Sequence, residues 1–394
     1  MIPPSLNLLF LVPRLHVGGV QRQLCLLAGG LRAVGHRVLI ATLVPGGAFR
    51  ADLLAQGIPA VCLGDGEHPS PRLLTRLLAL LKRERPDILH SYLPSANVLA
   101  ELAKGLHPET AVVWGLRLTE ADRRRYAALH RITYWLERKL QWTADLMIAN
   151  APSVREAAIA AGVPASRIAV VPNGFDADGF RPDADGRKRM RETWGIADGE
   201  RLIGLVGRLD PMKGHEVFLE AARRLAAEDP TLRFVCVGPD PYGRRFELEA
   251  LTRRLGLAHR LFWRGSESRM REVYSALDIL CHASIFGEGF SNVIAEAMLC
   301  GVPCVATDVG HSRELVRDVG ALVSPGDAEA LADACRALLR RAGHDAAAAR
   351  RRGRERIAEA CPVERLVSRT EALLSTLHAA ARRPLARKDQ GTSA

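Results

Sequence analysis

One segment of this chain reads Gly287-Glu288-Gly289-Phe290-Ser291-Asn292-Val293-Ile294-Ala295-Glu296-Ala297-Met298. Its two glycines around Glu288 predict a turn, and the residues after them predict a helix. Short apolar runs at 278–281 and 302–305 flank the segment and predict buried strands. The segment therefore indicates an α/β architecture in which strands and helices alternate.

The same alternation extends in both directions along the chain. Amphipathic helical stretches such as 20–34, 72–84 and 215–227 lie between strand-like apolar runs. Continuous apolar strands are typical of parallel sheets that helices cover on both faces. We therefore expect two doubly wound domains, because the runs form two series: 6–12, 36–43, 58–63, 87–90, 111–114, 145–149 and 168–171, then 201–206, 232–237, 260–263, 278–281, 302–305 and 321–323.

The two series are separated by residues 176–200, which are rich in Asp, Gly and Arg and contain no apolar strand. We place the domain boundary there. The predicted units are a first domain at 1–178, a second at 179–362, a helix at 363–380 and a polar, disordered basic tail at 381–394.

The charge of the chain is unusual. Its 394 residues include 55 Lys and Arg against 44 Asp and Glu, a net charge of +11. Residues 117–139, 336–356 and 382–389 carry net charges of +4, +6 and +3, which leaves about −2 elsewhere. Such a chain favours an anionic partner: nucleic acid, a phosphorylated substrate or an acidic membrane. Aromatic residues make up only 5%, and no nucleic-acid recognition module is present, so we expect no nucleic-acid partner.

A hydrophobic content of 48% excludes a mainly disordered chain. No apolar run reaches the roughly 18 residues that a membrane span needs. The apolar N-terminal run 6–12 has no basic segment before it and no small-residue cleavage site after it, so it predicts a first strand, not a signal peptide. The eight cysteines form no Cys-x-x-Cys pair, which favours a reducing, cytoplasmic location.

Two further segments contain residues that could bind a phosphate group. Gly204-Leu205-Val206-Gly207-Arg208-Leu209-Asp210-Pro211-Met212-Lys213-Gly214-His215 predicts a strand, a basic turn and a helix. Arg208 and Lys213 then lie at the carboxyl end of a strand, where open α/β sheets bind ligands. Gly18-Gly19 follows the first strand and would let the backbone approach a phosphate closely, although a plain turn explains it equally well.

The segment around Glu288 adds backbone amides and two carboxylates that could contact a bound molecule. The amides of Ser291–Val293 would lie at a helix N-terminus, which attracts phosphate. Glu288 would project from the loop, and Glu296 would lie two turns into the helix, where it can accept ribose hydroxyls. The alternative is that Glu288 caps the helix and Glu296 is solvated.

His90 ends the strand of Asp87-Ile88-Leu89-His90-Ser91-Tyr92. It could contact a sugar from a cleft or be a satisfied structural histidine. Asn97 and Arg117 could line the same cleft, and Asn173-Gly174 predicts a turn next to the domain boundary.

Together these segments resemble the retaining glycosyltransferase family 4 (glycosyl transferases group 1), over roughly residues 6–375. The motifs occur in the family's order: the Gly-Gly loop, Asp-x-x-His, Val-Pro-Asn-Gly-x-Asp, Gly-Arg-x-x-x-x-Lys-Gly and Glu-x7-Glu with its Gly-Phe. The resemblance implies the GT-B fold, with two Rossmann-like domains facing a central cleft and a C-terminal helix that crosses back to the first domain. Many relatives have an acid where this chain has Gln21, which keeps the hydrogen bonding of an acid but carries no charge.

The resemblance also implies roles. Arg208 and Lys213 would hold the diphosphate of a nucleotide-sugar donor, Glu288 and His90 the sugar, and Glu296 the ribose. The other donor-binding residues would be Gly18, Gly19, Gly289, Phe290, Ser291, Asn292 and Val293. The expected reaction transfers a sugar to a hydroxyl of a glycan or lipid-linked acceptor, in polysaccharide or glycolipid synthesis, with retained anomeric configuration. Fixed cations and helix amides can stabilise the leaving diphosphate, so we expect no cofactor and no obligatory metal.

Two alternatives stay open at this point. A nucleotide-sugar epimerase of the same fold would also bind a diphosphate between two such domains, although it would need acid–base carboxylates in the cleft. The basic stretch 117–139, with apolar residues at helical spacing and with Tyr134, Trp135 and Trp142, predicts either an anionic membrane surface contact or an ordinary helix with a solvated face.

Overall fold

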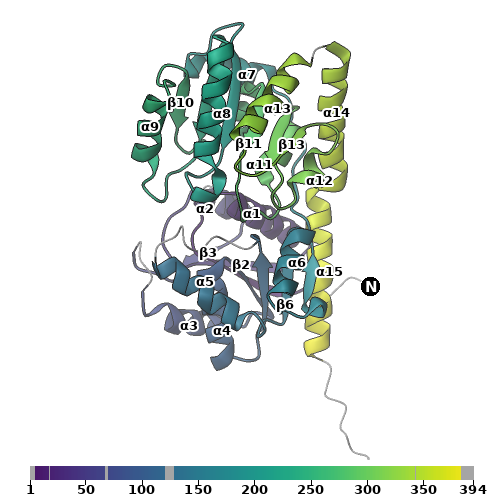
Figure 1. Ribbon diagram of the computed structural model, residues 1–394. Coiled ribbons are helices and arrows are strands. Elements are labelled where there is room, and N and C mark those ends of the chain that lie inside the picture. The colour runs from purple at the N-terminus through teal and green to yellow at the C-terminus, as the bar shows by residue number, and fades with distance from the viewer. Residues whose placement is uncertain (1–4, 17, 67–69, 120–127, 342, 383–394) are drawn as a thin grey trace, which may run out of the picture.

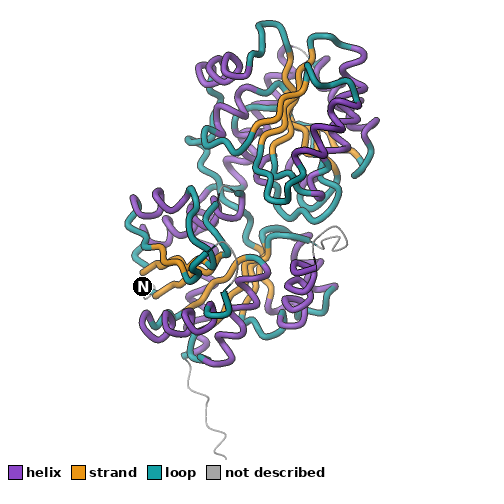
Figure 2. Tube along the Cα trace, turned by 90° about the vertical axis from the view of Figure 1, so that its left-hand side faces the viewer, coloured by secondary structure: helices purple, strands orange, loops and turns teal. Residues whose placement is uncertain are grey.

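The computed structural model describes residues 5–16, 18–66, 70–119, 128–341 and 343–382. They form two α/β units stacked one above the other (Figures 1 and 2). Each unit is built on one sheet whose strands are all parallel. The predicted fold class is confirmed.

The first unit contains a seven-stranded sheet in the order β3-β2-β1-β4-β5-β6-β7. Its strands are β1 (Asn7–Val12), β2 (Arg37–Thr42), β3 (Ala60–Cys62), β4 (Ile88–Tyr92), β5 (Ala111–Leu116), β6 (Leu146–Ala149) and β7 (Ile168–Val170). Its helices are α1 (Gly19–Ala33), α2 (Phe49–Ala55), α3 (Leu73–Glu84), α4 (Pro94–Leu106), α5 (Ala128–Leu140) and α6 (Pro152–Ala160). Every strand corresponds to an apolar run predicted from the sequence, because helices cover both faces of the sheet.

The second unit contains a six-stranded sheet in the order β10-β9-β8-β11-β12-β13. Its strands are β8 (Arg201–Val206), β9 (Leu232–Val237), β10 (Leu261–Arg264), β11 (Ile279–His282), β12 (Cys304–Thr307) and β13 (Ala321–Val323). Its helices are α7 (Ala184–Trp194), α8 (His215–Glu228), α9 (Arg245–Arg254), α10 (Met270–Ala276), α11 (Asn292–Leu299), α12 (Ser312–Val316), α13 (Ala328–Arg340) and α14 (Gly343–Ala360).

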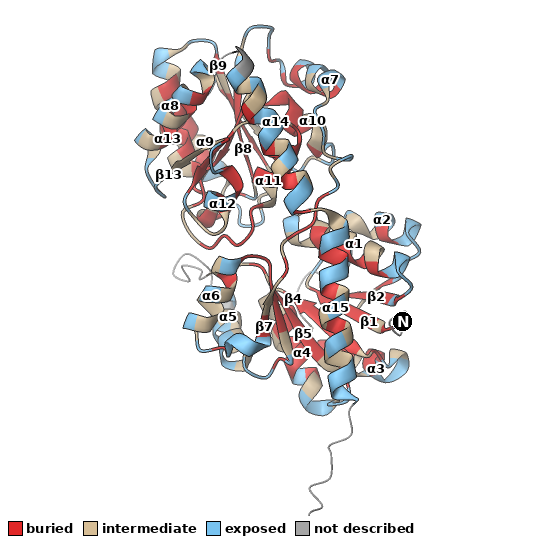
Figure 3. Ribbon diagram, turned by 90° about the vertical axis from the view of Figure 1, so that its right-hand side faces the viewer, coloured by how far each residue is buried: buried red, intermediate tan, exposed pale blue. Residues whose placement is uncertain are grey.

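The last helix, α15 (Val363–Ala381), follows α14 out of the second unit and runs along the first one (Figure 3). Its buried residues Leu366, Val367 and Leu374 belong to the same apolar cluster as Phe10 and Leu24 of the first unit. The helix that the sequence predicts at 363–380 is therefore packed against the first sheet's helices, as the family resemblance implies.

The two sheets lie within the predicted ranges 1–178 and 179–362, and the exact domain boundaries stay a prediction. The segment between the sheets also contains α7, which the sequence analysis did not predict. Met190 and Trp194 bury one face of α7 against α10. Most of the predicted tail at 381–394 lies outside the described residues.

Candidate active site at the junction of the two units

Both sheets reverse their strand order at the centre, between β1 and β4 in the first and between β8 and β11 in the second. Open α/β sheets bind ligands at the carboxyl ends of the strands beside such a switch point. The loops there meet across the junction: Leu118, after β5, forms an isolated bridge with Glu288, after β11. A Cβ on Gly19, at the start of α1, would lie 2.7 Å from Nδ2 of Asn292. The structure thus brings Gly19 and the Glu288 segment together.

Glu288 is the centre of a buried polar cluster. Its Oε1 lies 2.5 Å from Nζ of Lys213, accepts a hydrogen bond from Oγ of Ser284 at 2.6 Å and lies 3.2 Å from Nε2 of His282. All the contacts of Glu288 side-chain oxygens with described residues fall on Oε1. Oε2 is therefore the carboxylate oxygen that remains for a ligand.

Burial alone would raise the pKa of Glu288, but the ammonium of Lys213 and the hydrogen bond from His282 outweigh it and hold the pKa well below its usual value. Glu288 is consequently an anion at neutral pH, and it fixes the position of the Lys213 ammonium. An ionised carboxylate of this kind is suited to orienting groups, not to donating a proton.

Glycine is required at one position in the Glu288 loop and at one in the Lys213 turn. A Cβ on Gly289 would lie 2.5 Å from Oδ1 of Asn150 and 2.7 Å from the carbonyl oxygen of Arg117, so the loop touches the first unit through bare backbone. Gly214, which follows Lys213, has φ of +64°, and a Cβ there would meet the carbonyl oxygen of Ala283 at 2.0 Å. The close approach of Gly214 to Ala283 places Lys213 beside the end of the strand that leads to Glu288.

Arg208 lies at the end of β8 with its side chain 44% exposed. The buried Asp210 accepts a hydrogen bond from Nη2 of Arg208 at 3.0 Å and another from the backbone of Met212. Asp210 thus shapes the turn and holds Arg208 on one side. The exposed remainder of the guanidinium can bind an anionic ligand.

The helix that follows the Glu288 loop begins at Asn292, so the amides of Ser291–Val293 do lie at its N-terminus. The side chain of Asn292 accepts a hydrogen bond from Nδ2 of Asn173 at 2.6 Å. Phe290 is buried between the rings of Phe175 and His311, at 5.6 and 5.4 Å between ring centres. Phe290 therefore anchors the loop, and the backbone of the loop is what faces the junction.

Glu296 is buried and has a partner on each oxygen. Oε1 lies 2.7 Å from Nη1 of Arg22, and Oε2 accepts a hydrogen bond from the hydroxyl of Tyr274 at 2.7 Å. Burial and the Glu296 carboxylate raise the pKa of Tyr274 well above its usual value, so the hydroxyl stays a donor. The sequence analysis missed both partners. Arg22 lies in the first turn after Gly18-Gly19, but nothing local to it indicates a partner 274 residues away.

His90 lies in the interior of the first sheet. Its ring is 1% exposed and stacks on Tyr92 at 4.5 Å between ring centres. Neither ring nitrogen has a hydrogen-bond partner among the described residues, and burial, with Arg117 nearby, lowers the pKa of His90 well below its usual value. In this conformation His90 is a neutral core residue, and its contact with a sugar stays a prediction.

Gln21 and Gly18 lie beside each other at the start of α1. The Gln21 side chain donates a hydrogen bond to the carbonyl oxygen of Arg14 at 3.2 Å and contributes no charge to the junction. The described residues contain no cluster of three or more His, Cys, Asp or Glu side chains that could hold a metal ion. The expectation that no metal is obligatory stays a prediction.

The molecule is thus a two-domain α/β protein of the GT-B fold, with Arg208, Lys213 and the N-terminus of α11 where its two switch points meet. Sequence profiles cover both halves: the one described as "Glycosyltransferase Family 4" matches residues 17–178, and the one described as "Glycosyl transferases group 1" matches residues 200–341. The chain belongs to this glycosyltransferase family.

Curated relatives include a D-inositol 3-phosphate glycosyltransferase of Nocardia farcinica, 36% identical over 213 residues, which are 52% of this chain and 47% of the relative. A second is the GDP-mannose-dependent alpha-(1-6)-phosphatidylinositol monomannoside mannosyltransferase of Mycolicibacterium smegmatis, 34% identical over 45% of this chain and 48% of the relative. The chain spans about half the length of the curated relatives it matches.

Solved structures match over nearly the whole chain. HepE of Anabaena, in complex with UDP and glucose, is 25% identical with a TM-score of 0.82 over 94% of this chain and 100% of that one. WaaG, a glycosyltransferase involved in lipopolysaccharide biosynthesis, shares the fold at 18% identity, with a TM-score of 0.71 over 93% of this chain and 99% of that one.

Proposed function

We propose that this protein is a retaining glycosyltransferase that moves a sugar from a nucleoside-diphosphate sugar to an acceptor hydroxyl. The observation that carries the proposal is the Lys213–Glu288 contact at 2.5 Å, buried at the junction of a GT-B fold. The carboxylate fixes an ammonium at the carboxyl end of β8, beside Arg208. This is where a departing diphosphate needs positive charge.

Each junction residue has a role in this reaction. Lys213, Arg208 and the amides at the start of α11 stabilise the charge that develops on the diphosphate when the bond to the sugar breaks. Oε2 of Glu288 orients the sugar, and Glu296 binds the ribose once Arg22 and Tyr274 share it with the ligand. Both carboxylates are engaged by cations or donors, so neither offers the acid–base pair that the epimerase alternative needs. The proposal that the anomeric configuration is retained rests on the family resemblance. The described junction residues show no evident nucleophile that would indicate the stereochemistry by itself.

The printed names of relatives support different donors: one is GDP-mannose-dependent, and HepE was solved with UDP and glucose. We therefore expect one of the UDP-, GDP- or ADP-sugars to be turned over. Purified protein incubated with each sugar nucleotide is followed by proton NMR. The proposal predicts release of the nucleoside diphosphate with the sugar's anomeric configuration retained in the first product, and loss of release in Lys213→Ala by about 10- to 1000-fold. Release that survives within about twofold in Lys213→Ala contradicts the diphosphate role.

We also propose that the acceptor is lipid-linked and that the first unit contacts an anionic membrane from the cytoplasmic side. Residues 120–127 of the predicted patch lie outside the described residues, but α5 exposes Ile132 and Trp135, and Trp142 follows it, at 54%, 52% and 59% exposure. Arg131 and Lys139 are exposed on the same helix. Exposed aromatic rings among cations are suited to the interface of an acidic bilayer. None of the described helices is both long and apolar enough to span a membrane.

Liposome flotation tests the membrane contact. Wild-type protein is expected to float with vesicles containing anionic lipid and to be released by salt, while Trp135→Ser/Trp142→Ser floats much less. Phe246→Ser, at an aromatic residue that is 79% exposed in the second unit, is the matched control and should float like wild type. Equal flotation of all three proteins, or none by any, overturns the membrane contact.

A further inference from the structure

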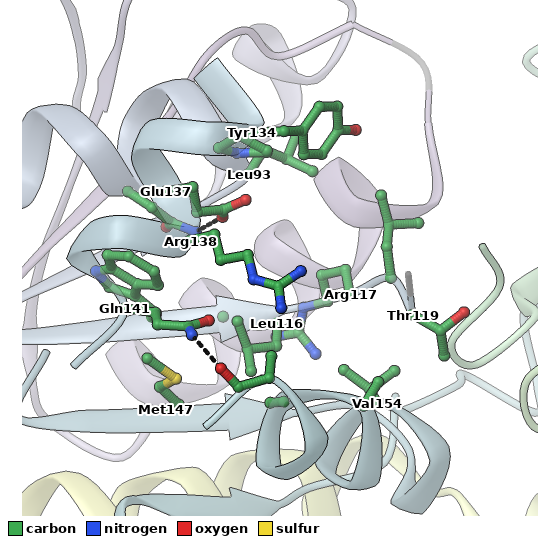
Figure 4. A pocket seen from close by; sticks show the side chains of 18 of the residues that line it. Leu93, Leu116, Arg117, Thr119, Tyr134, Glu137, Arg138, Gln141, Met147 and Val154 are labelled. Carbon is green, nitrogen blue, oxygen red and sulfur yellow. Dashed lines mark hydrogen bonds between the residues drawn. The ribbon is translucent and has the colours of Figure 1, made fainter. Parts of the chain in front are cut away.

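The first unit contains a cavity that the donor site does not use. It has a volume of about 260 Å³ and lies between α4, α5, α6 and the end of β5 (Figure 4). That volume exceeds the roughly 150 Å³ of an apolar cavity that takes up benzene, so a small group fits inside. None of Arg208, Lys213, Glu288 or Glu296 lines it.

The two ends of the cavity differ in chemistry. Trp114 and Met147, which are partners on the neighbouring strands β5 and β6, make one end largely apolar. At the other end the guanidinium groups of Arg117 and Arg138 point into the same space (Figure 4). One carboxylate, Glu137, also lines the cavity, and it accepts a hydrogen bond from Asn97 at 2.7 Å.

Arg117 gives the second, independent indication of a ligand. It is 8% exposed, and its described contacts are Oδ1 of Asn173, at 3.4 Å, and the ring of Tyr92, with its guanidinium carbon 4.9 Å from the ring centre. Neither contact is a carboxylate, and Nε has no hydrogen-bond partner among the described residues. Among the described residues no carboxylate contacts Arg117, and a buried cation left without an anion is costly, so the site favours a negatively charged ligand.

The polar end of the cavity also adjoins the donor loop. The carbonyl oxygen of Arg117 would lie 2.7 Å from a Cβ on Gly289, and the next residue but one, Thr119, still lines the cavity. A group held by Arg117 is therefore next to the loop that carries Glu288. This position is where an acceptor has to present its hydroxyl.

We propose that this cavity binds an amphipathic anionic acceptor, with a hydrocarbon segment against Trp114 and Met147 and a phosphate-type anion on Arg117 and Arg138. The inference rests on the proposed glycosyltransferase function and deepens it by naming the acceptor class. A phosphate on a hydrocarbon and free inorganic phosphate share the same anionic chemistry, and only the first also fills the apolar end.

Titration calorimetry with octyl phosphate, octanol and inorganic phosphate tests the proposal. Octyl phosphate is expected to bind at least about tenfold more tightly than either other probe, because only it satisfies both ends. Ala157→Leu on α6 fills the cavity and should abolish octyl phosphate binding, while Glu156→Leu, at the exposed neighbouring residue, should leave it unchanged. Arg117→Gln should weaken octyl phosphate about tenfold or more and leave octanol unaffected.

Three outcomes overturn the proposal: inorganic phosphate binding as tightly as octyl phosphate, Ala157→Leu binding octyl phosphate like wild type, or nucleoside diphosphate displacing it competitively. The last result would assign Arg117 to the donor. Binding of nucleoside diphosphate is measured on the same variants. If Ala157→Leu retains it, the protein is folded and the donor site is intact, so failure of the acceptor inference is distinguished from failure of the glycosyltransferase proposal.

Discussion

At the residue scale, each of two buried carboxylates of the junction lies beside a half-buried cation. Glu288 pairs with Lys213, and Glu296 pairs with Arg22. Sequence motifs single out Arg208, Lys213 and Glu288 after predicted strands and Glu296 within a predicted helix, and their roles stay predictions. The motifs do not identify Arg22, Tyr274 or Ser284, since these residues act through partners that only the folded chain brings close.

His90 shows a different limit of prediction from sequence. Its place at the end of a predicted strand and the family resemblance were the basis for assigning it to the sugar. A strand end says nothing about the direction of the side chain, and here the ring lies between Phe10 and Tyr92 in the core.

The low pKa of Glu288 has a consequence for stability in acid. A carboxyl group whose pKa is lower in the folded than in the unfolded protein stabilises the fold above its ordinary value of 4.5, and this contribution is lost as the pH falls through the folded-state pKa. Glu288→Gln should therefore be less stable than wild type at pH 7, by about 1–3 kcal/mol, with the difference shrinking below about pH 4.5.

Urea unfolding at pH values between about 3 and 7 measures this difference. Glu156→Gln, at an exposed position, serves as the control and should follow wild type throughout. A difference between Glu288→Gln and wild type that does not change with pH would show that the carboxyl group is not ionised in the fold by its contact with Lys213.

At the scale of elements, strand positions are predicted well because strands covered on both faces are continuous apolar runs, as in β1 and β8. Helix α7 was missed because its sequence is largely polar, and its few apolar residues Met190 and Trp194 are buried by packing against α10. The position of α15 depends on long-range contacts, so its periodicity predicts a helix and only the family resemblance indicates where it docks.

The packing of α15 on α1 depends on one glycine. A Cβ on Gly30 would lie 2.2 Å from Cγ2 of Val367. Gly30→Ala should destabilise the protein by about 1–3 kcal/mol through this clash, although alanine favours a helix interior by about 1 kcal/mol over glycine. In a Val367→Ala background the clash is gone, so Gly30→Ala should become neutral or stabilising.

Thermal and urea unfolding of the two single variants and the double variant provide the complete cycle. If Gly30→Ala has the same effect with Val367 and with Ala at position 367, then α15 does not pack on α1 through this contact.

At the scale of the whole molecule, the two units meet through pairs drawn from distant parts of the sequence, among them Arg22–Glu296 and Asn173–Asn292. Composition alone predicted an anionic partner from the net charge of +11. In the structure, the cations proposed to bind phosphate and the basic patches lie in different places. Arg208 and Lys213 lie at the junction outside the three basic patches, whereas α5, in the 117–139 patch, lies on the first unit next to the cavity.

The central claim is that the junction binds a nucleoside diphosphate through Lys213. Titration calorimetry with UDP, GDP and ADP on wild type, Lys213→Ala and Lys188→Ala tests it, with Lys188 as an exposed lysine on α7. One diphosphate should bind wild type and Lys188→Ala equally and bind Lys213→Ala about 10- to 100-fold more weakly, as expected for the loss of a charge-assisted contact. Equal affinity of Lys213→Ala and wild type, or no binding of any of the three diphosphates, would contradict the account.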